Sequence, residues 1–137
     1  MEIREYNVDN GKDLLCLYAS VGWTAYTDNP ILLEAGVQNS LLTLGAYEGK
    51  DLIGLIRAVG DGYTILYTQD ILVKPEYQRR GIGTSLIRSL LDRYADVRQI
   101  LLMTDDTPGT AAFYRSLGFT RLEQIGCCGF IKAAESS

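Results

Sequence analysis

The sequence contains no histidine and only three cysteines. Common zinc sites use histidine and closely spaced cysteine pairs, and Cys16, Cys127 and Cys128 form no C-x-x-C pair. We therefore expect no metal site and no Cys–His nucleophile pair. Any general base that acts near neutral pH must be a carboxylate, a tyrosine, a water chain or the substrate itself. The adjacent Cys127 and Cys128 are expected to be small, buried residues of a C-terminal strand rather than a redox pair.

Long apolar runs and excess positive charge are also missing. No stretch approaches the roughly 20 apolar residues of a membrane span, and the N-terminal "MEIREYNVDN" has no apolar signal core. The net charge of −4 gives no support to a nucleic-acid partner. We expect a cytoplasmic protein without membrane or nucleic-acid partners, folded as a single domain over residues 1–137.

The pattern of apolar residues and turn signals predicts a mixed α/β domain without repeats. Short strand-like runs separated by "EGK" and "GDGY" predict three consecutive hairpin strands in the middle of the chain. The predicted elements follow the order β-α-α-β-β-β-α-β-α-β-β, over residues 2–6, 13–21, 30–39, 41–47, 51–59, 64–73, 81–94, 99–104, 108–118, 119–124 and 127–132.

Two closely spaced glycines stand at the start of the helix predicted over 81–94, in the stretch "PEYQRRGIGTSL". Gly81 and Gly83 let a backbone approach a bulky group, and the start of a helix presents N–H groups without partners. Together they indicate an anion site, most often for a phosphate. The glycines alone are also consistent with a tight connection between a strand and a helix.

A Rossmann dinucleotide site is the second alternative for this stretch, and it fails in two places. Leu86 occupies the position of the third glycine, and seven residues separate Val73 from Gly81. The preceding strands are also predicted hairpins rather than βαβ units.

The stretch "VKPEYQRRGIGTSLI" resembles the acetyl-coenzyme A motif of the GNAT superfamily of N-acetyltransferases, Gln/Arg-x-x-Gly-x-Gly/Ala. A second stretch, "TAAFYRSLGF", is similar to the family's Tyr-x-x-x-Gly-Phe helix through Tyr114, Gly118 and Phe119. The resemblance covers residues 1–132. It implies the GNAT fold, a mixed central sheet with a splayed strand pair, and acetyl-CoA as cosubstrate without a metal.

The resemblance also implies which residues hold acetyl-CoA. Backbone N–H groups from about Arg79 to Thr84 bind the pyrophosphate, and the backbone of the preceding strand binds the pantetheine arm and polarises the thioester carbonyl. Thr107 stands where the family often has an asparagine that contacts the coenzyme, and it is expected to cap the following helix. The implied cofactor contacts are Ile71, Leu72, Val73, Gln78, Arg79, Arg80, Gly81, Ile82, Gly83, Thr84, Thr107 and Tyr114.

GNAT enzymes transfer the acetyl group directly to an amine, and the family motif implies that Tyr114 protonates the leaving thiolate. The other interpretation of Tyr114 is a core residue of an amphipathic helix. Asp70, within an apolar strand, and Asp105, at the end of another, are candidates to orient or deprotonate the amine. Alternatively, Asp70 caps a bulge and Asp105 caps the next helix, while Asp106 is a solvated charge.

The acceptor side is implied to be lined by the segment "YASVGWTAYTDNP", which carries Trp23 and Tyr26. An exposed aromatic pair suits an aryl or alkyl amine, whereas a tryptophan packed under the loop does not inform on the acceptor. Similarity to arylalkylamine-type members favours a small-molecule amine. Protein amines, glucosamine 6-phosphate and a non-catalytic acetyl-CoA-binding module stay open, as does a homodimer.

Overall fold

A computed structural model describes residues 1–132 of the chain. These residues belong to a first unit, Met1–Met103, and a second unit that begins at Thr104. Within the described residues, no helix is both long and apolar enough to cross a bilayer.

One sheet organises the first unit, with its strands in the order β1-β2-β3-β4-β5. The strands are β1 (Glu2–Glu5), β2 (Leu42–Glu48), β3 (Asp51–Gly60), β4 (Ile65–Val73) and β5 (Gln99–Leu102). The first four pair antiparallel with their neighbours, and β5 joins β4 in parallel. The three hairpin strands expected from the sequence are confirmed as β2, β3 and β4. Gly49, at φ +61°, supplies the left-handed residue that the tight turn between β2 and β3 requires.

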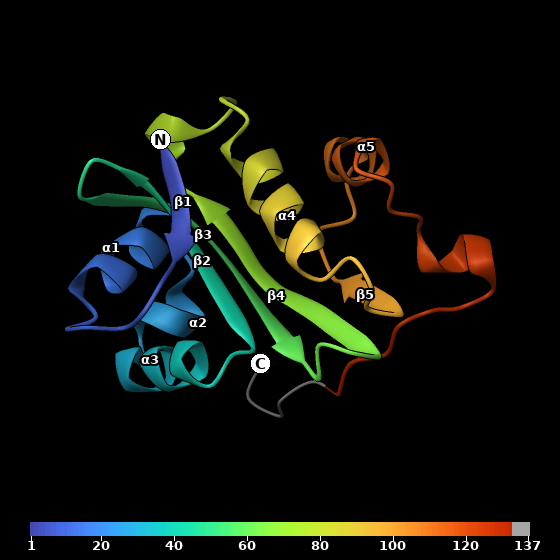
Figure 1. Ribbon diagram of the computed structural model, residues 1–137, viewed down its shortest axis with the longest axis horizontal. Coiled ribbons are helices and arrows are strands. Elements are labelled where there is room, and N and C mark those ends of the chain that lie inside the picture. The colour runs from blue at the N-terminus through green and yellow to red at the C-terminus, as the bar shows by residue number, and fades with distance from the viewer. Residues whose placement is uncertain (133–137) are drawn as a thin grey trace. The chain divides into compact units, whose positions relative to one another are not determined.

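Helices cover both faces of this sheet (Figure 1). The helices α1 (Lys12–Ser20), α2 (Thr24–Thr27) and α3 (Pro30–Gln38) lie on one face, and α4 (Ile82–Arg93) lies on the other. The core on the α1 side includes Leu14, Leu17, Tyr18, Leu33 and Val37. On α4, the apolar stripe at Ile82, Leu86, Ile87 and Leu90 is buried, as its helical spacing predicts.

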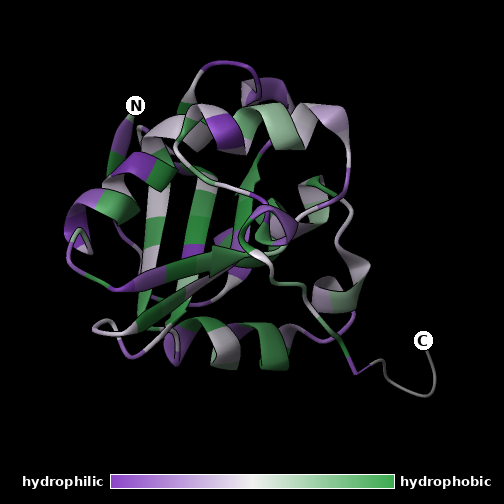
Figure 2. Cartoon of the chain, turned by 90° about the vertical axis from the view of Figure 1, so that its right-hand side faces the viewer, coloured by the Kyte–Doolittle hydropathy of each residue, from purple (hydrophilic) through white to green (hydrophobic). Residues whose placement is uncertain are grey.

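Hydropathy follows this layering. Figure 2 shows long hydrophobic stretches along the central strands, whereas hydrophilic and hydrophobic residues alternate along the helices. The residues of β3 from Leu52 to Ala58 are all buried, Arg57 included. A strand buried on both faces leaves a charged side chain without water, so Arg57 needs a partner within the protein.

The second unit contains α5 (Pro108–Ser116) and a 3₁₀ helix, η2 (Leu122–Ile125). The strands predicted over 119–124 and 127–132 are wrong: the first segment holds η2, and residues 126–132 lie in no strand. Local bonds replace strand pairing, because the N–H groups of Gln124, Gly126 and Cys127 donate to carbonyls three to five residues back. Cys127 and Cys128 are exposed rather than buried, since no strand partner covers them.

Candidate functional site

Strand β4 continues beyond its parallel partner. The pairing of β4 with β5 ends at Thr68 and Leu102, while β4 runs on to Val73 against β3 alone. Between Thr68 and Asp70 the register with β3 also shifts, so that Gln69 has no partner on β3 and forms a β-bulge. The splayed strand pair expected from the sequence is thereby confirmed. Beyond Gln69, the β5-facing edge of β4 presents backbone groups that a peptide-like ligand can bind.

The loop after β4 is tied to the end of the sheet. The N–H of Lys74 donates to the carbonyl of Ile53 at 2.8 Å, and Gln78 Nε2 donates to the carbonyl of Val73 at 3.0 Å. A single 3₁₀ turn, η1 (Pro75–Tyr77), lies between these two bonds. Gln78 thus holds the loop in place through its side chain.

Two left-handed residues shape the end of this loop. Arg79 has φ +64° and Gly81 has φ +80°, and α4 begins at the next residue, Ile82. When residues just before a helix adopt the left-handed conformation, their successive N–H groups point toward one side. This arrangement makes a concave anion site. A Cβ placed on Gly81 would meet no atom within 4 Å, so the space beside it is open. A phosphate therefore fits this loop.

Two arginines place positive charge on the loop itself. Arg79 and Arg80 are both exposed, and the Arg80 guanidinium lies 5.2 Å from the ring centroid of Tyr77. This stacking limits the freedom of Arg80. The loop thus combines backbone donors with two exposed positive charges on a protein that is acidic overall.

A buried ion pair lies on the α1 side of the sheet, next to the bulge. Arg57 on β3 and Asp70 on β4 are cross-strand partners, and only 7% and 4% of their surfaces are exposed. Arg57 Nε and Nη2 contact the same carboxylate oxygen, Asp70 Oδ2, at 2.9 and 2.8 Å. The charged residue buried in β3 therefore has its counter-ion.

Two tyrosines complete the surroundings of Asp70. The hydroxyl of Tyr18 on α1 donates to Asp70 Oδ2 at 2.9 Å, and that of Tyr26 on α2 donates to Asp70 Oδ1 at 2.8 Å. Burial, followed by the Asp70 carboxylate, raises the pKa of the Tyr18 hydroxyl, and burial also raises the pKa of Tyr26. Both oxygens of Asp70 are thus occupied by donors that stay protonated at neutral pH.

The aromatic residues of the acceptor-side segment are half-buried rather than displayed on a loop. Trp23 precedes α2 and packs against the core, with ring centroids 5.8 Å from Tyr18 and 6.3 Å from Tyr26. Tyr26 lies within α2, and its ring meets Tyr18 edge-on at 5.0 Å. Of the two interpretations from the sequence, packing against the core describes Trp23 better.

In the second unit, Thr107 caps α5. Its Oγ1 accepts the N–H of Thr110 at 3.1 Å, and the Thr110 side chain bonds back to the Thr107 N–H. This capping box fixes the start of the helix. The helix-capping role expected for Thr107 is confirmed.

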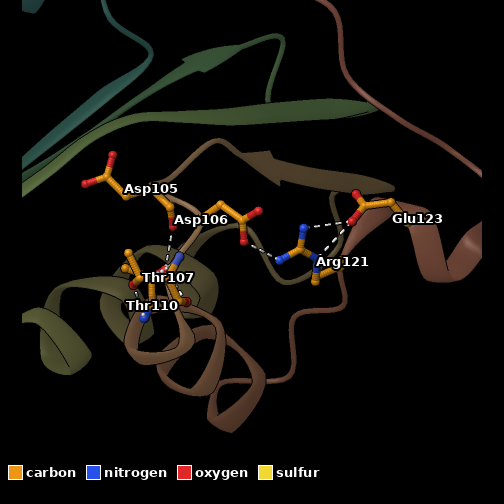
Figure 3. Close-up of polar contacts among 6 residues, drawn as sticks. All are labelled: Asp105, Asp106, Thr107, Thr110, Arg121 and Glu123. Atoms are coloured by element: carbon orange, nitrogen blue, oxygen red, sulfur yellow. Dashed lines mark hydrogen bonds and ion pairs between the residues drawn. The ribbon is translucent and has the colours of Figure 1, made fainter.

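Asp105 and Asp106 differ in their surroundings, as Figure 3 shows. Asp106 forms a 2.8 Å ion pair with Arg121, whose hydrogen bond and charge hold the pKa of Asp106 below its usual value. The carboxylate of Asp105 points away from that pair, and its backbone carbonyl accepts bonds from Thr107 and Thr110. Within residues 104–132, no side chain is bonded to the Asp105 carboxylate.

Tyr114 lies on α5 between two aromatic neighbours. Its ring meets Phe113 at 5.0 Å and Phe119 at 5.8 Å, both edge-on. Burial raises the pKa of its hydroxyl, and a hydrogen bond with Thr104 opposes this effect. The hydroxyl therefore carries its proton throughout the neutral range, as a general acid must.

Three residues around Asp70 and the bulge were not expected from the sequence to belong to the site: Arg57, Tyr18 and Gln69. A signal existed for Arg57, which is the single charge inside the apolar run "LIGLIRAV". It faces Asp70 when the two strands form a hairpin. The bulge at Gln69 and the reach of Tyr18 from α1 depend on tertiary packing and left no local signal.

Known proteins that are similar to this chain are acetyltransferases. The family described as "Acetyltransferase (GNAT) domain" matches residues 39–121. A solved GNAT-family acetyltransferase from Streptococcus pneumoniae is 38% identical, with a TM-score of 0.87 over 98% of each chain. The histone acetyltransferase TAP1 of Glycine max is 35% identical over 78% of this chain and 50% of its own.

A crystal structure of an aminoglycoside 6'-N-acetyltransferase complexed with coenzyme A is also similar. It is 25% identical, with a TM-score of 0.68 over 77% of this chain and 63% of that one. The chain spans about half to two-thirds of the length of the first curated relatives that it matches. The family match covers more than half of the chain, and this protein therefore belongs to the GNAT family of acetyltransferases.

Proposed function

We propose that this protein transfers the acetyl group of acetyl-CoA directly to a primary amine, without an acyl-enzyme. The observation that carries the proposal is the divergence of β4 from β5 at Gln69, immediately before a loop shaped for phosphate. An open strand edge followed by an anion site suits a long cosubstrate with an amide-containing arm and a pyrophosphate. A solved relative at 25% identity is complexed with coenzyme A, which supports the same cosubstrate.

The donor is held by two parts of the first unit. The N–H groups from Arg79 to Thr84 bind the pyrophosphate, and the left-handed Gly81 keeps their approach open. The backbone of Ile71, Leu72 and Val73 binds the pantetheine arm. An N–H group in this stretch that meets the thioester carbonyl stabilises the oxyanion formed when the amine attacks.

The reaction needs one group that gives a proton to the thiolate and one that accepts a proton from the amine. Tyr114 keeps its proton at neutral pH and delivers it to the departing thiolate. Asp105 is our candidate to accept the proton of the amine, because no side chain within residues 104–132 is bonded to its carboxylate. Asp70 is already bonded by Arg57, Tyr18 and Tyr26, so we assign it an orienting role.

For the acceptor we propose a small-molecule amine. The likeness to an aminoglycoside N-acetyltransferase supports this class. A protein amine is the second candidate, favoured by the 35% identity with a histone acetyltransferase. Trp23 and Tyr26 are the proposed acceptor contacts, because both residues are only half-buried.

The test is a titration followed by an amine panel. Acetyl-CoA is titrated calorimetrically, and thiol release is then measured with phenethylamine, kanamycin and a peptide with a free N-terminus. Fast release with a small amine supports the proposal, and release with the peptide alone supports the protein-acceptor alternative. Binding without release with any amine would indicate an acetyl-CoA-binding module instead.

A further inference from the structure

Gln69 occupies the position where β4 changes its partners, and nothing assigned so far uses its side chain. It is exposed, has no partner on β3 and follows the last residue that pairs with β5. A bulge re-aims the side chain of the extra residue, and bulges occur next to active sites. One hydrogen bond fixes the side chain, because Gln69 Nε2 lies 3.3 Å from the Tyr26 hydroxyl oxygen.

The direction of every hydrogen bond at Tyr26 is determined by its neighbours. The hydroxyl has one proton, and it donates this proton to Asp70 Oδ1 at 2.8 Å. A carboxylate paired with a guanidinium can only accept. The remaining partners of the Tyr26 oxygen must therefore be donors, and Arg57 Nη2, at 3.1 Å, is always one.

The Gln69 amide must donate to the same oxygen, so its nitrogen faces Tyr26 and its carbonyl oxygen faces away. A flipped amide would place two acceptors against each other and lose the bond. Within the first unit, no side chain donates to Gln69 Oε1. A fixed, exposed acceptor therefore stands where β4 and β5 part.

We infer that Gln69 Oε1 binds an N–H of the acceptor amine and orients the nitrogen lone pair for attack. This inference rests on the proposed acetyl transfer and names a specificity residue for it. An amide oxygen accepts a hydrogen bond without taking a proton, so Gln69 selects for a group with N–H bonds and leaves deprotonation to another residue. The Arg57–Asp70 pair acts through Tyr26 to hold Gln69 in place.

The experiment measures steady-state thiol release with the best amine among phenethylamine, kanamycin and the free peptide. Gln69→Leu removes the acceptor at similar volume, and we expect the KM for the amine to rise by about 10-fold or more. The Kd for acetyl-CoA should stay within about two-fold of wild type, because the phosphate loop is unchanged. Gln99→Leu, an exposed glutamine on β5 of the same sheet, is the matched control and should leave both constants unchanged.

Two further variants separate the acceptor role from a structural one. Gln69→Glu keeps an acceptor oxygen but loses the amide donor that holds the side chain at Tyr26, so it should bring the KM only part of the way from the Gln69→Leu value back to wild type. Tyr26→Phe should raise the KM alone but add little in the Gln69→Leu background, because Tyr26 acts through Gln69.

The assignment is overturned if folded Gln69→Leu keeps the wild-type KM, or if Gln69→Glu and Gln69→Leu raise it equally. Failure of the proposed function looks different. In that case wild-type protein binds acetyl-CoA but releases no thiol with any of the three amines, and the Gln69 assignment falls with it.

Discussion

The guanidinium of Arg57 contacts one oxygen of the Asp70 carboxylate through two nitrogens, directly across strands β3 and β4. Both side chains are more than nine-tenths buried. Buried pairs contribute little net stability compared with apolar residues, but a partner left alone is strongly destabilising. We therefore infer that the main role of the pair is to position Tyr26 and Gln69, and we expect the removal of one partner to destabilise the fold.

Arg57→Met should destabilise the fold by about 3–5 kcal/mol, because the Asp70 carboxylate is left buried with only two tyrosine donors. Urea unfolding measures the loss. The double variant Arg57→Met/Asp70→Leu should recover much of it, since no unpaired charge remains. A double variant that is no more stable than Arg57→Met would contradict the interpretation of the pair.

Much of the fold follows from local patterns in the sequence. The hairpin strands β2 to β4 were predictable because turn signals separate alternating and apolar runs, and α4 because its apolar residues repeat at helical spacing. The tight connection into α4 was predictable from Gly81, which precedes the helix in a left-handed conformation. The wrong predictions concern residues 119–132, where short apolar segments suggest strands, although a strand forms only where a partner is available.

The candidate site was predictable in part, for a physical reason. Asp70 was noticed as a charge in an apolar strand, but its surroundings come from residues far away in the sequence. Tyr18 lies 52 residues and Tyr26 44 residues from Asp70 along the chain. Such contacts depend on how α1 and α2 pack on the sheet, which no local pattern contains.

Gly81→Val should weaken acetyl-CoA binding severely, by about 10-fold or more, because a branched Cβ enters the open space beside the loop amides. Calorimetric titration measures the effect. Valine in a left-handed conformation also strains the backbone, and Gly49→Val is the control for this strain. Gly49 has φ +61° with no atom within 4 Å of its virtual Cβ, yet lies in the β2–β3 turn. Equal affinities in the two folded variants would remove the phosphate loop assignment.

Asp105→Asn should lower kcat/KM most at neutral pH. The kcat/KM of the variant should recover in part as the pH rises, because more of the amine is then unprotonated. The reason is that the Asp105 carboxylate, which no side chain within residues 104–132 bonds, can take a proton from the amine, whereas Asp106 is paired with Arg121. Asp106→Asn is the matched control. It removes only a solvent-exposed ion pair with Arg121, which contributes little to stability, and should leave the pH profile unchanged. A profile that shifts equally in both variants would exclude Asp105 as the base.

The stability of the protein should fall as the pH rises above about 10. Burial raises the pKa of the Tyr18 hydroxyl in the folded state above its ordinary value of 10.0. Above that value, the folded state binds more protons than the unfolded state, so the stabilisation present below pH 10 is lost as the pH increases. Unfolding free energies of Tyr18→Phe should depend less on pH in this range. Tyr63→Phe, at an exposed site, should behave like wild type.

Tyr114→Phe should lower kcat by roughly 10²-fold and leave the Kd for acetyl-CoA close to wild type. Only an oxygen is removed, so the edge-on packing with Phe113 and Phe119 is retained. Because burial raises the pKa of Tyr114 above 10.0, the acid form persists at every pH below that value. Wild-type kcat should therefore show no alkaline decline from this group between about pH 6 and pH 9.

Single-turnover measurements separate chemistry from product release in this comparison, and Tyr63→Phe is again the control. A wild-type kcat in Tyr114→Phe, with an amine that wild type acetylates quickly, would assign protonation of the thiolate to water. An alkaline decline that starts below pH 9 in wild type and persists in Tyr114→Phe must come from another group, since the tyrosine hydroxyl is then absent.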